Sequence, residues 1–210
     1  MDSITNSGLY YPNLFARIII KAIEEILGKN GINCTLSNAQ LHQFIDQLPP
    51  PNLKKLFDFS FLSRISLSIE QLYGRQSGFG INLRSGRAII AEALRHYGDE
   101  AGINTNSFKL LPITQKMDWG LTALADTITS LSDQPTILND TGSEYEFIIE
   151  KCPVCWHRSS ERQPVCYLFT GLLQETTKWL SCGKDYHVQE IECIAMGNPV
   201  CRFIISKKPI

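Results

Sequence analysis

Cysteines give this chain its clearest chemical signal. Of the seven cysteines, Cys34 stands alone, and the other six lie beyond residue 150, at Cys152, Cys155, Cys166, Cys182, Cys193 and Cys201. Thiolates bind zinc, and pairs of thiols can also cycle between the reduced and the disulfide form. The opening segment MDSITNSGLYYPNL lacks the basic and apolar regions of a secretory signal. We therefore expect a cytoplasmic protein whose cysteines are thiols or metal ligands rather than disulfides.

The stretch VQEIECIAMGNPVCRF places three candidate metal ligands close together in sequence. Cys193 and Cys201 stand on the two arms of a predicted hairpin that turns at Gly197-Asn198-Pro199. Paired strands lie close enough for both thiolates to reach one ion. Glu190 comes three residues before Cys193, so in a regular strand the two side chains would point to opposite faces. A shared ion therefore predicts a β-bulge near Ile191-Glu192.

Cys152-Pro-Val-Cys155 forms a second local pair, with His157 two residues further on. Zinc sites often use two such C-x-x-C pairs, and this chain has one. No strand-loop-helix pattern of the thioredoxin type surrounds it, so a redox role is weakly indicated. Spacing alone leaves three interpretations open. A metal site and buried structural thiols balance each other, and a redox pair stands behind them.

Catalytic motifs give no positive evidence for an enzyme. The chain contains neither G-x-S-x-G nor H-E-x-x-H, and it shows no nicotinamide or flavin fingerprint. The glycine-rich segment from Tyr73 to Arg87 lacks the Gly-Lys-Ser/Thr ending of a phosphate-binding loop. We interpret its glycines as points of close packing. The histidines are scattered, without an evident Ser or Cys partner, at His42, His96, His157 and His187.

Composition and charge exclude some classes of partner. The net charge is −1, and no basic excess favours nucleic acid. The apolar stretch ARIIIKAIEEILG is interrupted by Lys21, Glu24 and Glu25, so the protein is expected to be at most peripheral to a membrane. Aromatic side chains exceed what a small core needs, and a minority is expected to line an apolar ligand cavity. The candidates are Phe79, Trp119, Phe147 and Trp156.

Hydrophobic spacing divides the chain into a mainly helical part, residues 1–133, and a strand-helix-hairpin part, residues 134–210. A period near 3.6 predicts helices over 9–31, 37–49, 60–74, 81–98, 113–132 and 164–183. Alternation predicts one strand within 143–152 and two within 186–206. These elements predict a single domain, 1–210, of the α+β class, with an N-terminal helical bundle packed on a small antiparallel sheet.

The C-terminal motif resembles a known family. EKCPVCWHRSSERQPVCYLFTGLLQ, followed by VQEIECIAMGNPVCRF, is similar to the 4-vinyl reductase domain family over Lys151 to Phe203. That family is named after a protein linked to vinyl reduction in bacteriochlorophyll synthesis. Its members resemble the small subunits of the TRAPP tethering complex in fold. They include the sensory domains of bacterial activators that detect phenols and other aromatics.

The resemblance implies a fold, a ligand and a metal. It implies helices packed on an antiparallel sheet, a homodimer formed through the helices, and a small apolar ligand bound between helices and sheet. In the aromatic-sensing members zinc is held by a Cys at a helix start followed by Glu-x-x-Cys-x7-Cys. Those positions match Cys166, Glu190, Cys193 and Cys201. Cys152 and Cys155 are then a separate feature, either a rival ligand pair or a redox pair.

Three functions follow as hypotheses. The first is a binding module for an apolar or tetrapyrrole-like ligand, with a structural zinc, acting in photosystem or pigment biogenesis. The second is a scaffold or tethering protein that works through exposed helix faces, for which a filled interior is expected. The third is an enzyme or accessory factor related to tetrapyrrole vinyl reductases, with an organic cofactor of unknown identity.

Overall fold

The computed structural model describes residues 5–97 and 105–210. Within them the chain forms helices and two antiparallel sheets, so the predicted α+β class is confirmed. The α-helices are α1 (Asn13–Asn38), α2 (Phe59–Tyr73), α3 (Arg75–Tyr97), α4 (Asn106–Lys109), α5 (Ile113–Leu131) and α6 (Tyr167–Leu180). The strands are β1 (Tyr10–Pro12), β2 (Lys55–Asp58), β3 (Thr136–Asp140), β4 (Glu144–Ile149), β5 (Tyr186–Glu192) and β6 (Cys201–Pro209). Three short 3-10 turns are η1 (His42–Phe44), η2 (Pro153–Cys155) and η3 (Ile194–Met196).

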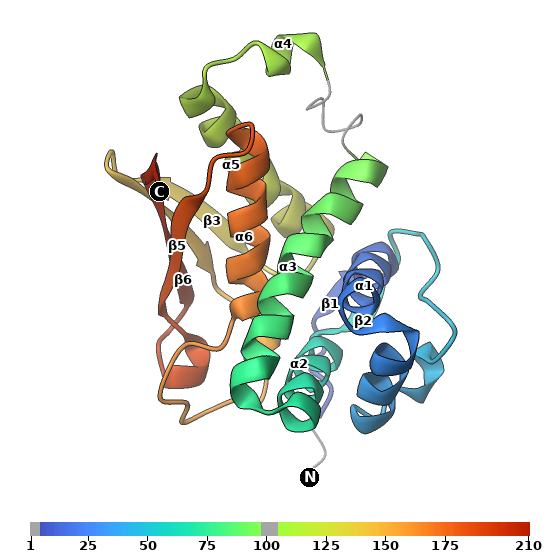
Figure 1. The fold of residues 1–210 in the computed structure, drawn as a ribbon. Coiled ribbons are helices and arrows are strands. Elements are labelled where there is room, and N and C mark those ends of the chain that lie inside the picture. The colour runs from blue at the N-terminus through green and yellow to red at the C-terminus, as the bar shows by residue number, and fades with distance from the viewer. Residues whose placement is uncertain (1–4, 98–104) are drawn as a thin grey trace.

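The larger sheet has the strand order β3-β4-β6-β5, and every neighbouring pair is antiparallel. Helices α5 and α6 pack against it, with α5 on β3 and α6 on β5. Helix α3 lies on α6, and α1 and α2 pack on α3 (Figure 1). β1 and β2 form a separate two-stranded sheet beside α1. The C-terminal strands therefore reach the N-terminal helices through two helical layers.

Glycines allow α3 and α6 to pack with their backbones in close approach. A Cβ atom added to Gly86 would lie 2.0 Å from the carbonyl oxygen of Leu168, and one added to Gly171 would lie 1.9 Å from that of Leu83. At Gly78 an added Cβ would meet the Cα of Glu70 at 2.7 Å. The interpretation of the glycine-rich segment as a point of close packing is confirmed.

Several predicted elements need correction. The helix expected over 37–49 is wrong, because α1 continues through a kink at Gly28, where φ is +70°, and uses Ser37 and Asn38 as its last turn. Only the three-residue turn η1 lies in the remainder. Helix α3 begins at Arg75, inside the glycine-rich segment, rather than at residue 81. Strands β1, β2 and β3 lie where the spacing predicts no strand, because three to five residues are too few to establish a period.

The C-terminal half follows its prediction closely. β4, α6 and the β5–β6 hairpin lie at the places that the spacing indicates. Gly197 adopts a left-handed conformation with φ of +97° at the expected turn. Over the described ranges, no helix combines the length and apolar character needed to cross a bilayer.

Candidate ligand cavity and cysteine cluster

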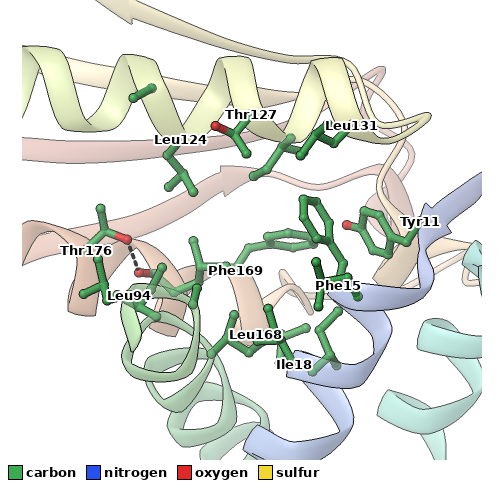
Figure 2. A pocket seen from close by; sticks show the side chains of 18 of the residues that line it. Tyr11, Phe15, Ile18, Leu94, Leu124, Thr127, Leu131, Leu168, Phe169 and Thr176 are labelled. Atoms are coloured by element: carbon green, nitrogen blue, oxygen red, sulfur yellow. Dashed lines mark hydrogen bonds between the residues drawn. The ribbon is translucent and has the colours of Figure 1, made fainter. Parts of the chain in front are cut away.

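An apolar cavity of about 410 Å³ lies between α1, α3, α5 and α6 (Figure 2). This volume falls in the range of small-molecule pockets. The residues at its wall include Tyr11, Phe15, Ile18, Leu94, Leu124, Leu131, Leu168 and Phe169. Each of the four helices turns an apolar face inward, as amphipathic helices around a core do. Here the side chains leave an open space instead of meeting.

Few polar groups border this cavity. The hydroxyl of Thr176 donates to the carbonyl oxygen of Leu172 at 2.8 Å, so its hydrogen is already used by its own helix. The hydroxyl of Tyr11 donates to Oε1 of buried Gln134. Burial raises the pKa of Tyr11 well above its usual value, and the thiols of Cys152 and Cys166 add to the effect. The phenol therefore stays neutral, and the described wall suits an uncharged ligand.

Five buried cysteines gather beside the cavity, and none of them forms a disulfide. The sulfur of Cys166 lies 3.4 Å from that of Cys152, 3.2 Å from that of Cys155 and 3.7 Å from that of Cys201. The sulfur of Cys155 also lies 3.5 Å from those of Cys193 and Cys201. We call these five residues, with Glu190, the cysteine cluster.

Two ligand sets in the cluster have the spacing of a metal site. Cys166, Glu190, Cys193 and Cys201, the set that the family pattern implies, offer ligand atoms within 4.8 Å of one another. Cys152, Cys155, Cys166 and Cys201 do so too. The structure thus joins the C-x-x-C pair to the C-terminal motif, which sequence spacing had kept apart.

Local turns present these thiols. Cys166 is the residue directly before α6, and Cys193 and Cys201 flank the tight η3 turn of the hairpin. The backbone N–H of Cys193 donates to the side-chain oxygen of Asn198 at 3.1 Å, and that of Ile194 donates to the sulfur of Cys201 at 3.4 Å. An N–H contact of the second kind orients a sulfur and favours its thiolate form.

Glu190 has one occupied and one unpartnered oxygen. Oε2 accepts the backbone N–H of Cys166 at 2.9 Å, whereas Oε1 has no hydrogen-bond partner among the described residues. Burial raises the pKa of Glu190 to about 9, and nearby Cys193 adds to this. The register of β5 against β6 shifts between Glu190 and Glu192, so the predicted bulge is confirmed. The bulge turns Glu190 toward the same site as Cys193.

A buried ion pair holds the C-x-x-C segment against α2. Arg158 donates to both carboxylate oxygens of Glu70, at 2.6 and 3.0 Å, and also to Glu161 at 2.9 Å. The hydroxyl of Ser63 donates to the carbonyl oxygen of Trp156 at 2.6 Å. The neighbouring thiols, Cys152 first, hold the pKa of Cys155 well below its usual range. These contacts place η2 over the C-terminal hairpin.

The four predicted aromatic residues lie outside the described wall of the cavity. Phe79 is buried and stacks on Tyr167, with ring centroids 4.4 Å apart. Trp119 is partly exposed and contacts Phe108, Phe147 is buried in the core, and Trp156 lies near His157. Their role as ligand-binding residues stays a prediction.

Sequence reasoning missed the residues that do line the cavity. Leu168 and Phe169 follow Cys166 closely in the first turn of α6, and their helical spacing was visible. That spacing indicates an inward face, but it does not separate a cavity wall from a filled core. Cys182 and Cys34 are exposed and lie apart from the cluster.

Comparison with known families centres on this cluster. The family model of the 4-vinyl reductase domain matches residues 145–207. The resemblance to this family is confirmed. The matched segment runs from β4 to β6 and contains every member of the cysteine cluster. No curated protein matches the chain at a significant level.

Solved structures share the fold of this 4-vinyl reductase domain protein. A structure from work on heme distortion in the H-NOX family aligns over 93% of this chain and 95% of that chain, at 15% identity and a TM-score of 0.60. An oxygen-binding H-NOX domain related to soluble guanylate cyclases aligns over 91% and 93%, at 14% identity and 0.58. The phenol-responsive sensory domain of the transcription activator PoxR, with phenol, aligns over 73% and 77%, at 19% identity and 0.51. These similarities establish a common α+β architecture.

Proposed function

We propose that this protein is a small-molecule-binding module that takes a neutral, apolar ligand in the cavity between α1, α3, α5 and α6. The cavity itself carries the proposal, because a wall of Leu, Ile and Phe side chains gains free energy when an apolar ligand covers it. Its volume also argues against the scaffold hypothesis, which expects a filled interior. The phenol bound by the PoxR sensory domain, which has the same fold, is of the proposed chemical class.

Haem, which the H-NOX structures concern, does not suit the described wall. Haem iron takes an axial His, Cys, Met or Tyr. Among the lining residues that the structure describes, Tyr11 alone has such a side chain, and its hydroxyl is bound to Gln134. The same residues include no Lys or Arg to pair with porphyrin carboxylates. A tetrapyrrole carrier in photosystem or pigment biogenesis would need such groups, so a smaller uncharged ligand is favoured.

The cysteine cluster supports a structural zinc beside the cavity. Buried thiols at these distances are the donor set that zinc prefers. The ion would hold the backbone before α6 to the β5–β6 hairpin, and the next turn of α6 carries Leu168 and Phe169 into the cavity. We infer that the metal braces one wall of the ligand site.

Binding of a neutral fluorescent probe tests the ligand site. N-phenyl-1-naphthylamine should bind the wild-type protein with a rise in fluorescence, and phenol should compete for the site. Ala123 lines the cavity on α5, so Ala123→Phe would fill it and should weaken probe binding at least about tenfold. Thr122→Phe adds the same ring at the neighbouring exposed position and should leave binding unchanged. Equal affinity of wild type and Ala123→Phe would overturn the proposal.

The homodimer and the peripheral membrane association expected from the sequence stay predictions. Sedimentation velocity measures the first, with a dimer expected at micromolar concentration. Co-sedimentation with vesicles of mixed neutral and anionic lipid measures the second.

A further inference from the structure

Cys155 occupies the centre of the cysteine cluster. Its sulfur lies 3.2 Å from that of Cys166 and 3.5 Å from those of Cys193 and Cys201. Four sulfurs around one zinc ion, each about 2.3 Å from it, are separated by about 3.8 Å at tetrahedral angles. The three contacts of Cys155 are therefore only slightly shorter than the edges of a four-thiolate site. A small outward movement around a cation would produce that geometry.

The other three thiols form a base to which a fourth ligand is added. Cys166, Cys193 and Cys201 lie within 4.8 Å of one another, and 3.7 Å separates the sulfurs of Cys166 and Cys201. An ion held by these three has two candidates for its remaining position. One is Glu190, as the family pattern implies, and the other is Cys155.

Glu190 already has a structural contact. Its Oε2 accepts the backbone N–H of Cys166 at 2.9 Å, which ties β5 to the start of α6. A carboxylate in that position orients a ligating residue from outside the coordination sphere. Cys155, by contrast, would lie in contact with three ligating sulfurs and yet take no part in binding. A soft thiolate also competes well with a carboxylate for zinc.

The backbone presents Cys155 to the base in a fixed position. Cys155 ends the η2 turn, where its N–H donates to the carbonyl oxygen of Cys152 at 3.2 Å. Its own carbonyl oxygen accepts from the N–H of Arg158 at 2.9 Å, and Arg158 is bound to Glu70 of α2. Such a turn is a rigid support of the kind that thiolate metal sites require.

We propose that Cys155, Cys166, Cys193 and Cys201 hold a single thiophilic divalent cation, with Glu190 and Cys152 outside its coordination sphere. The inference rests on the metal of the proposed function and changes its ligand set. Four protein thiolates close the coordination sphere, so the ion binds no exchangeable water and serves the fold. The cation thereby joins η2, the start of α6 and both arms of the β5–β6 hairpin.

Cobalt substitution tests the ligand set in the full chain. Cobalt(II) bound to thiolates has a sulfur-to-metal charge-transfer band whose intensity follows the number of sulfur ligands. Cys155→Ser and Cys193→Ser should each lose about a quarter of this band, because one of four thiolates is removed. Glu190→Gln keeps an oxygen acceptor for Cys166, so it should retain the full band and the tetrahedral visible bands. Cys152→Ser should do the same.

X-ray absorption of the zinc-loaded wild-type protein needs no variant to fold. We expect four sulfur scatterers at about 2.3 Å. Three sulfurs and one oxygen, or a spectrum that Glu190→Gln alters and Cys155→Ser does not, would overturn the proposal in favour of Glu190. Loss of the band in Cys152→Ser but not in Cys193→Ser would overturn it in favour of Cys152. A wild-type protein that takes up neither metal would refute the metal itself, whereas probe binding in the cavity reports on the ligand function separately.

Discussion

At the scale of single residues, two buried carboxylates determine how the chain ends are attached to the core. Glu70 on α2 binds Arg158 through both oxygens, which fixes the segment that carries Cys155. Asp58, the residue before α2, accepts from Ser60 and from the N-terminal residues Ser7 and Gly8. In both cases a charge is buried because several donors surround it.

Glu70→Gln should destabilise the protein by about 3 kcal/mol. The substitution leaves the guanidinium of Arg158 buried with only Glu161 as a charged partner among the described residues. Urea unfolding measures the loss. The exposed pair of Lys29 and Asp46 offers a control, and Lys29→Met should leave the midpoint unchanged. Equal effects of the two substitutions would contradict a special contribution from the buried pair.

Asp58→Asn should cost about 1–2 kcal/mol at neutral pH, because the side chain caps α2. Burial raises the pKa of Asp58, but the hydrogen bonds from Ser60 and Ser7 outweigh this and hold the pKa below its usual value. Its stabilisation is therefore fully present above the unfolded pKa near 4 and is lost as pH falls through the lower folded value. The stabilities of wild type and variant should converge in acid.

Unfolding at several pH values checks this convergence. Asp126→Asn, at an exposed position of α5, is the matched control and should follow the wild type throughout. A difference between wild type and Asp58→Asn that stays constant below pH 4 would show that the charge is not involved.

At the scale of elements, the contact of α3 with α6 places both the cavity and the cluster. Gly86 and Gly171 let the two backbones approach, and α6 then begins at the cluster and lines the cavity with its first turns. One helix thus connects the two sites. The separation of the helix axes, rather than any single side chain, determines whether both sites form.

Gly86→Ala should destabilise the protein by about 3 kcal/mol, because the new methyl group would meet backbone atoms that cannot move independently. Gly80→Ala on the same helix has open space around the new methyl group and should stabilise by up to about 1 kcal/mol. Thermal unfolding distinguishes the two. Similar melting temperatures for both variants would refute the close contact.

At the scale of the whole molecule, the cysteine cluster joins segments that are far apart in sequence. η2, the start of α6 and the hairpin meet there, and the buried hydroxyl of Tyr11 extends the contact to the N-terminal helices. A cation at this point would connect the sheet to the helical layers. Ligand binding and metal binding are then expected to support each other.

Metal removal should lower both stability and ligand affinity. Treatment of the purified protein with a zinc chelator should lower the melting temperature by more than about 5 °C and weaken binding of N-phenyl-1-naphthylamine, because α6 loses its attachment. Differential scanning fluorimetry and probe titration measure the two effects. Cys34→Ser removes an exposed thiol and should respond to the chelator as the wild type does. Unchanged probe affinity after metal loss would separate the two sites.

The local pattern of residues by itself determined the C-terminal hairpin, the helix after Cys166 and the bulge near Glu190. Each rests on contacts between residues close in sequence or on turn chemistry that a few residues specify. Cys166, Cys193 and Cys201 could therefore be nominated together, with the help of a family pattern. The α+β class followed from the change of period along the chain.

Tertiary structure alone decided two matters. Cys152 and Cys155 reach the cluster because the ion pair of Arg158 and Glu70 folds their loop onto α2, and no local pattern encodes a contact across 88 residues. The cavity exists because four apolar helix faces are held apart by their packing. A leucine that borders an open space and one that fills a core have the same periodicity, so only the arrangement of the helices distinguishes them.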